Sequence, residues 1–372
     1  MRKKFFLLSA TSCLLIINAC KKDNALLTTP QQTNTDAGKS HDKDHGGGGN
    51  QNNPMPSLYD FITPSYVEAF LTPNNNPATN EGVALGRKLF YEKMLSNNST
   101  ISCASCHKQE KAFSDPRRFS LGTAGNPGNR NAMAIINPGW NTTLFWEGRR
   151  STLEEQAHDP VTNPVEMANT WPVAVQRLQQ DPHYPDMFEK AFGTRTIDST
   201  LVVQAISQFE RTFISFNSRF DQQEFLGQNV FTAQEARGRE LFFGTARCSG
   251  CHKSPLMTDF GFRNIGLDAI PADSGRITVT HLSTDYGKFK TPTLRNIALT
   301  APYMHDGRFS TLRQVVDFYT GGVQANSPNV AQGLVTTPIQ LSDHEKEDLI
   351  AFLETLTDNS FVTNPELSRP NP

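Results

Sequence analysis

The stretches CASCH at residues 103–107 and CSGCH at residues 248–252 decide the fold of this chain. In a C-x-x-C-H run, two thiols add to the vinyl groups of one haem, and the histidine becomes an axial ligand of its iron. A structural zinc site would instead close with four ligands from cysteine-bearing segments about 15–20 residues apart. The two runs here lie more than a hundred residues apart, which favours two covalently bound haems of the c type. The predicted haem-binding residues are Cys103, Cys106, His107, Cys248, Cys251 and His252.

The first residues carry the features of an export signal. Basic residues 2–4 precede an apolar stretch, residues 5–19, that is too short to span a bilayer comfortably. This stretch ends before Cys20 in a pattern that resembles a bacterial lipoprotein signal, with ordinary secretory cleavage nearby as the alternative. We therefore expect a signal peptide at 1–19 and a periplasmic protein held by a lipid on Cys20. Lys21 and Lys22 favour the outer membrane.

Residues 20–57 are polar and low in complexity, so they cannot offset the entropy of ordering and are predicted to be a flexible tether. The formal net charge is −2, and it becomes −5 once the three cations of residues 1–19 are removed. A mildly acidic body argues against nucleic acid as a partner and permits the docking of a basic redox protein.

An internal repeat surrounds the two haem motifs. GRKLF at 86–90 precedes the first motif, and GRELF at 238–242 precedes the second. The roughly 315 residues after the tether are enough for two domains, which we place at 58–225 and 226–372. Capping boxes that begin at Ser151, Thr232 and Ser342 predict helices, as do apolar stripes at helical spacing. We expect a mainly α protein, with two cytochrome-c-like domains packed around a haem–haem interface.

Four further stretches carry a family resemblance: FWEGR at 145–149, VEM at 165–167, TPTLRN at 291–296 and APYMHDG at 301–307. With the two haem motifs, they make the body of the chain resemble the bacterial dihaem cytochrome c peroxidases and their relative MauG, the methylamine-utilisation enzyme. A peroxidase haem needs one protein ligand, one open coordination site and an acid/base group.

The resemblance assigns these roles to residues. It makes His107 the proximal ligand of the peroxide-reacting haem, Glu166 the acid/base and Gln156 its polar neighbour. It places Trp146 between the haems as a relay. By itself, Glu166 could be a surface charge and Trp146 a core residue.

Two positions set the iron ligands apart from many family members. Thr123 stands where a loop histidine caps the first iron in many resting relatives, so we expect that iron to be open, unless His158 or another side chain binds it. Tyr319 stands at the methionine ligand of the second haem, as in MauG. Tyrosine would lower the potential of that haem, and Met304 or Met257 is the alternative ligand.

The resemblance also implies a calcium ion between the haems, bound by Asn131 and by the backbone carbonyls of Thr300 and Pro302. It makes His305 a partner of a haem propionate.

The predicted function is that of a peroxidase that reduces hydrogen peroxide to water with electrons from a small periplasmic cytochrome c or cupredoxin. The first alternative is a MauG-like oxidase that uses peroxide to oxidise side chains of a partner protein. The second alternative is a dihaem electron carrier without catalysis. The sequence leaves the oligomeric state open and is compatible with a homodimer.

Overall fold

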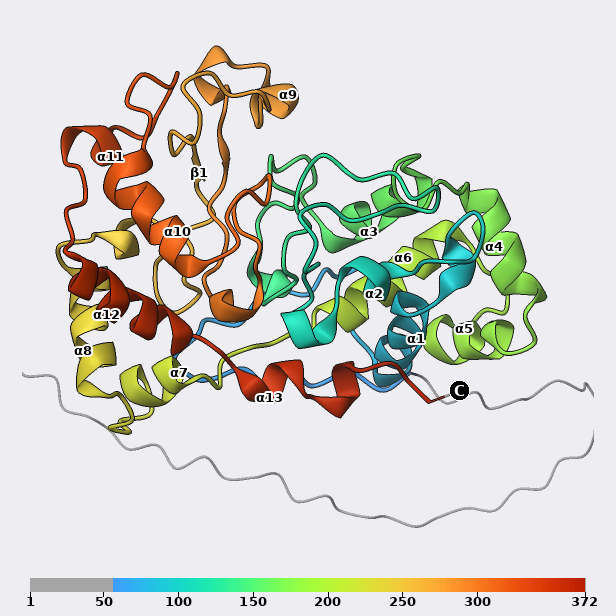
Figure 1. Ribbon diagram of the computed structural model, residues 1–372. Helices are drawn as coiled ribbons and strands as arrows, with labels where there is room; N and C mark the ends of the chain where they lie inside the picture. The colour runs from blue at the N-terminus through green and yellow to red at the C-terminus, as the bar shows by residue number, and fades with distance from the viewer. Residues whose placement is uncertain (1–55, 372) are drawn as a thin grey trace, which may run out of the picture. The chain divides into compact units, whose positions relative to one another are not determined.

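The computed structural model describes residues 56–371. The predicted signal peptide, Cys20 and nearly all of the predicted tether lie outside the described residues. The described chain is mostly helical and contains one two-stranded sheet, which confirms the mainly α prediction (Figure 1).

The helices fall into two groups along the chain. The first group is α1 (Asn80–Phe90), α2 (Cys103–Cys106), α3 (Leu153–Thr162), α4 (Trp171–Gln180), α5 (Tyr184–Phe192) and α6 (Ser199–Glu210). The second group is α7 (Arg219–Glu224), α8 (Ala233–Phe243), α9 (Ile277–Thr280), α10 (Leu312–Asp317), α11 (Gln332–Thr336), α12 (Asp343–Glu354) and α13 (Asn359–Val362). The π-helical turn η7 (Phe318–Gly322) extends α10, and β1 (Phe262–Arg263) pairs antiparallel with β2 (Phe289–Lys290).

The helix starts agree with the capping boxes at two of the three predicted places. Thr232 caps α8 and Ser342 caps α12, each with the predicted glutamate three residues later. The third prediction is wrong by one residue, because Thr152 is the N-cap of α3 and its side chain accepts from the amide of Glu155. The side chain of Glu155 then accepts a bond from the amide of Ser151, so the glutamate still closes the turn.

Each group of helices has its own core, and the repeated glycine explains how each core is built. In the first, α1 packs on α6, and a Cβ on Gly86 would lie 1.9 Å from the carbonyl oxygen of Ala205. In the second, α8 packs on α12, and a Cβ on Gly238 would lie 1.9 Å from the carbonyl oxygen of Asp348. Glycine is therefore required at both crossings, because any side chain would push the two helices apart.

The last residues of the chain return to the first core. Phe361 and Leu367 are buried in that core, and the hydroxyl of Tyr91 donates to the carbonyl of Leu367 over 2.8 Å. Figure 1 shows the chain running from α12 past α7 into α13 and on toward the foot of α1, where it ends. The boundary at 225/226 stays a prediction, and the structure adds that the C-terminal segment packs with the first core.

A buried polar cluster, made of Asn137, Ser215, Asn296 and Asp358, joins both cores to the segment between them. Ser215 exchanges backbone bonds with the Asn137 side chain, and its hydroxyl donates to a carboxylate oxygen of Asp358 over 3.1 Å. The side chain of Asn296 donates to the Ser215 hydroxyl and accepts from the amide of Asp358. All four residues are buried, and their hydrogen bonds to one another satisfy these polar groups and join the two cores.

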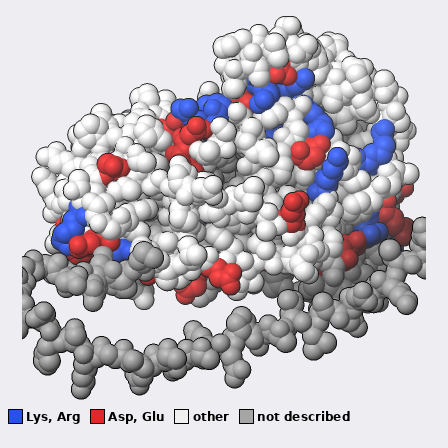
Figure 2. Space-filling view, turned by 180° about the vertical axis from the view of Figure 1, so that it is seen from behind, with Lys and Arg blue, Asp and Glu red and all other residues white. Residues whose placement is uncertain are grey.

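The surface carries charges of both signs. On the face in Figure 2, Lys and Arg side chains lie among Asp and Glu side chains, without an extended field of one sign. Among residues 56–371, no helix combines the length and the apolar character that crossing a bilayer requires.

Candidate haem sites

The two predicted iron ligands are oriented in the same way. His107 Nδ1 lies 2.8 Å from the carbonyl oxygen of Phe113, and His252 Nδ1 lies 3.2 Å from that of Met257. Such a bond fixes the ring and its tautomer and leaves Nε2 for the metal, as is usual for histidine ligands. Burial lowers the pKa of His252 to about 4 and also lowers that of His107, so both rings are neutral and able to bind iron at neutral pH.

The cysteines before these histidines are suited to thioether bonds. None of the four cysteines, Cys103, Cys106, Cys248 and Cys251, is in a disulfide. Burial raises the pKa of Cys103 and Cys248, which are protonated at neutral pH. The first pair lies on α2, and in the second pair Cys248 begins the 3-10 turn Cys248–Gly250 and Cys251 caps its end. Both motifs therefore fit covalent haem attachment.

A cavity of about 480 Å³ adjoins the second motif. It is lined by Cys248, Cys251 and His252 and, on other walls, by apolar side chains that include Leu349 and Leu353 of α12. Its size and largely apolar lining suit a flat, mostly apolar cofactor. The residues present thus fit a haem on this side of the chain.

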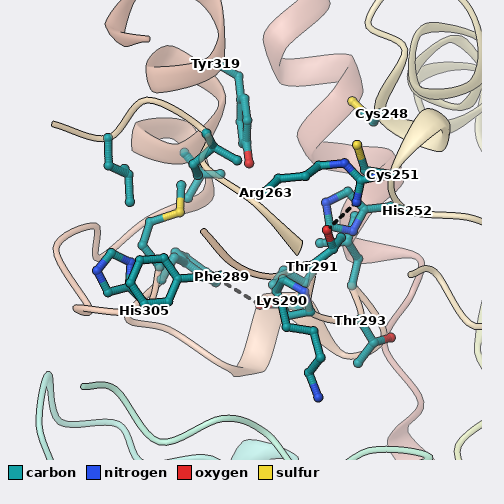
Figure 3. A pocket seen from close by; sticks show the side chains of 18 of the residues that line it. Cys248, Cys251, His252, Arg263, Phe289, Lys290, Thr291, Thr293, His305 and Tyr319 are labelled. Atoms are coloured by element: carbon teal, nitrogen blue, oxygen red, sulfur yellow. Dashed lines mark hydrogen bonds between the residues drawn. The ribbon is translucent and has the colours of Figure 1, made fainter. Parts of the chain in front are cut away.

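Tyr319 lies on the wall of this cavity across from His252. It belongs to the π-helical turn η7, and Figure 3 shows its hydroxyl directed into the pocket, toward Arg263. Burial raises the pKa of Tyr319, while the positive charge of Arg263 lowers it. Because π-turns often mark functional sites, the extra residue in this turn is consistent with a role for the phenol.

The two methionines that could replace Tyr319 are placed differently. Met257 is fully buried, and its carbonyl oxygen accepts the bond from His252, so its backbone supports the proximal histidine. Met304 lines the cavity together with Tyr319.

Glu166 lies near both thiols of the first motif. Its carboxylate acts electrostatically on Cys103 and Cys106, raising the pKa of both. Burial raises the pKa of Glu166 itself, and a 2.7 Å bond from Asn163 Nδ2 to Oε1 lowers it in part. Gln156 lies on α3, the helix that leads into this segment.

The glycine-rich loop that holds Thr123 packs on the backbone beside Glu166. The amide of Thr123 donates to the carbonyl of Glu166 over 2.9 Å, and a Cβ on Gly122 would lie 2.0 Å from the carbonyl oxygen of Val165. Glycine is therefore needed for this loop to approach so closely. His158 is exposed on α3 and lies against the ring of Trp171, at 5.0 Å between centroids.

Trp146 is held between the two parts of the chain by backbone groups. Its indole Nε1 donates to the carbonyl of Asn131 over 2.8 Å, and its own carbonyl accepts from the amide of Lys290 over 2.7 Å. The ring of His305 lies 6.4 Å away. Trp146 also lines the cavity of the second motif, with its ring held in a fixed orientation.

The three predicted calcium ligands line the same cavity, close to this tryptophan. They are Asn131, Thr300 and Pro302. The Nδ2 of Asn131 donates to the carbonyls of Arg117 and Arg118, which leaves its Oδ1 for a hard cation.

Sequence reasoning missed several residues of these sites. Asn163 holds Glu166, Arg263 faces Tyr319, and Lys290 is buried with Nζ donating to the carbonyl of Thr143 over 2.6 Å. His305, which the family resemblance already marks, stacks on Phe289 with ring centroids 3.7 Å apart, as is visible in Figure 3. No local pattern marks Arg263 or Lys290, because each gains its role from a contact between segments distant in the chain. Asn163 is the exception, since it lies three residues before Glu166.

Two helical cores, each with a C-x-x-C-H turn and an oriented histidine, define a dihaem cytochrome of the c type. The sequence profile of the di-haem cytochrome c peroxidases matches residues 80–230, and that of cytochrome c matches residues 235–357. The chain is 36% identical to the methylamine utilization protein MauG of Methylorubrum extorquens, across 79% of this chain and 84% of that protein.

Further relatives give the same answer. The chain is 34% identical to the cytochrome c551 peroxidase of Nitrosomonas europaea, across 76% of this chain and 81% of that protein. The crystal structure of a MauG-like protein associated with microbial copper homeostasis superposes with a TM-score of 0.78 and 38% identity, across 84% of this chain and 99% of that one. The chain therefore belongs to the dihaem cytochrome c peroxidase/MauG family, and it carries two covalently bound c-type haems.

Proposed function

We propose that this chain is a MauG-like oxidase, which reduces hydrogen peroxide to water at the first haem and withdraws the electrons from side chains of a partner protein through the second. For each hydrogen peroxide, the reaction consumes two electrons and two protons and forms two molecules of water. Tyr319 is the observation that favours an oxidase of this kind over a conventional peroxidase. A phenolate ligand would lower the potential of the second haem and stabilise its oxidised forms, whereas a methionine would raise the potential.

The first site supplies a place for peroxide and a group to move its proton. When bound, the first haem provides the iron at which the O–O bond breaks. Glu166 is held by Asn163 at one carboxylate oxygen, and its second oxygen is left to accept a proton from one peroxide oxygen and return it to the other. The burial that raises its pKa favours this exchange at neutral pH. Gln156 would orient the peroxide from α3.

Thr123 supports an iron that is open at rest. Its hydroxyl is a poor iron ligand, and its backbone is tied to Glu166 rather than free to swing away. Exposed His158 packs on Trp171. We therefore assign no capping side chain to the first haem, and we expect reaction with peroxide without prior reduction.

Trp146 would carry electrons from the second site to the first. Its indole and its backbone are both fixed by hydrogen bonds, which limits reorganisation of the ring. The backbone carbonyl of Asn131 accepts the hydrogen bond from the indole. A calcium ion bound by the side chain of Asn131 and by the carbonyls of Thr300 and Pro302 would therefore restrain this contact further.

A second candidate has the same first site and a different source of electrons. In that case a small cytochrome c or a cupredoxin reduces the second haem and the chain is a peroxidase. Relatives such as the cytochrome c551 peroxidase of Nitrosomonas europaea favour it. In both cases we place the mature protein in the periplasm, attached through a lipid on Cys20 and facing its partner with residues 58–372.

The experiment that tests the proposal is a titration of the fully oxidised holoprotein with hydrogen peroxide, with no reductant present, followed by visible and near-infrared absorption. We expect an immediate spectral change that is complete at one equivalent and slow to decay, with a near-infrared band that is lost in Tyr319→Phe. A spectrum that changes only after one electron is supplied would establish a reductively activated peroxidase instead. A protein that consumes no peroxide in either state would be an electron carrier.

A further inference from the structure

A carboxyl group at the end of α6 lacks the partners that a buried charge requires. Glu210 is only 4% exposed, and its Oε2 has no hydrogen-bond partner in the part of the chain that the structure describes. An ionised carboxylate in such a place is unfavourable unless it is paired, so the group is better accommodated in its neutral form.

The internal repeat shows where Glu210 faces. A Cβ on Gly86 would meet the carbonyl of Ala205 and the Cβ of Phe209, and a Cβ on Gly238 would meet the carbonyl of Asp348 and the Cβ of Phe352. The two helix crossings are therefore built in the same register. In this register Glu210 of α6 corresponds to Leu353 of α12.

Leu353 lines the cavity of the second haem, together with Cys248. By the repeat, Glu210 faces the first haem beside Cys103, the counterpart of Cys248. A separate observation agrees, because the charge of Glu210 acts directly on the Cys103 thiol and raises its pKa. The first haem site thus has an acid in its wall where the second has a leucine.

We propose that Glu210 is a positioning residue of the first haem that binds a proton when this haem gains an electron and releases it when the electron leaves. In the reduced state the iron is ferrous and Glu210 is protonated. On oxidation one electron passes to the second haem or to an electrode, one proton passes to solvent, and the carboxylate offsets the added positive charge of the ferric iron.

The charged groups around Glu210 permit this exchange at accessible pH. Burial raises the pKa of Glu210 to about 8, Arg211 on the same helix lowers it, and Glu154 on α3 raises it. Arg211 is itself paired with both oxygens of Glu154, at 2.8 and 3.0 Å, so that carboxylate largely neutralises its positive charge. Glu166 acts on Cys103 as well and is the other acid near this haem.

The sign of the effect follows from charge. Below the range in which Glu210 ionises, it is neutral in both redox states and the potential of the first haem does not depend on its proton. As the pH rises through that range, the carboxylate forms and stabilises the ferric state, so the potential falls. The pKa of about 8 places this fall in the mildly alkaline region.

The test is a spectroelectrochemical titration of the holoprotein from pH 6 to pH 10, with the two haems resolved by their spectra. We expect the potential of the first haem to fall with rising pH in the wild-type protein and in Glu166→Gln, and the fall to be lost in Glu210→Gln. Glu210→Leu copies the side chain of the second module and should give the same flat profile. Glu354→Gln removes an exposed carboxylate from α12 and should keep the wild-type profile.

Two results would overturn the proposal. One is a first-haem potential that is independent of pH in the wild-type protein, which needs no variant. The other is a pH dependence of that potential that follows the wrong residue. It would persist in Glu210→Gln or Glu210→Leu, or it would disappear in Glu166→Gln. The measurement uses neither peroxide nor a partner protein, so its outcome is separate from that of the proposed oxidase function.

Discussion

At the scale of single residues, Glu166 is the group that we propose to transfer the proton in the peroxide chemistry. Glu166→Gln keeps the shape and the bond from Asn163 but cannot exchange a proton. We expect haem content and the visible spectrum to be preserved and kcat for peroxide reduction to fall roughly 100-fold or more, the usual contribution of a general acid/base. Steady-state assays with a chemical electron donor measure this.

The matched control is Glu240→Gln, which removes an exposed carboxylate from α8. It should retain wild-type turnover. If Glu166→Gln also retains it, then Glu166 is a surface charge and another group moves the proton.

The second prediction at the scale of residues concerns Tyr319 and the potential of the second haem. Tyr319→Met replaces a phenol by a thioether, and we expect the potential of the second haem to rise, because methionine ligation raises haem potentials. Redox titration of the second haem measures the shift. Tyr303→Phe alters another tyrosine of the same cavity, one whose hydroxyl already donates to the carbonyl of Ile297, and should leave the potential unchanged. An unchanged potential in Tyr319→Met would mean that Tyr319 is not the ligand and would favour Met304 or Met257.

At the scale of elements, the helix crossings explain the repeated glycine that the sequence shows. Gly86→Ala forces a methyl group against the carbonyl oxygen of Ala205 and should lower the free energy of unfolding by at least the ~1–3 kcal/mol typical of overpacking. Thermal unfolding followed by circular dichroism measures this. Gly333→Ala in α11 meets nothing within 4 Å and should be neutral or slightly stabilising. Equal stability of the two variants would contradict the close crossing.

The elements also show how far sequence reasoning reaches. Three features could be predicted because each is a local pattern with one physical cause. They are the two haem-attachment motifs, the internal repeat, and the capping boxes at the starts of α8 and α12. The start of α3 was misplaced by one residue because Ser151 and Thr152 both suit a cap and two glutamates follow at the required spacing. Arg263, Lys290 and Glu210 could not be predicted, because their importance arises from burial and from contacts across the fold.

At the scale of the whole molecule, the buried polar cluster of Asn137, Ser215, Asn296 and Asp358 joins the two cores. Asn296→Leu would leave the Ser215 hydroxyl and the Asp358 amide each without one partner. We expect the free energy of unfolding to fall by about 1–3 kcal/mol for each stranded group, with both haem environments affected. Denaturant unfolding followed at the Soret band of each haem measures this.

The control is Asn74→Leu, at an exposed position in the N-terminal segment, which should leave both transitions in place. A loss of stability confined to the second haem would show that the cluster serves one core and does not connect the two.

The return of Phe361 and Leu367 to the first core has a consequence for biogenesis. During synthesis the first haem motif emerges long before these residues do, and its hydrophobic core lacks two of its members until they arrive. The half that is made first is therefore the last to be completed, which leaves its CASCH turn accessible to haem attachment for nearly the whole of synthesis.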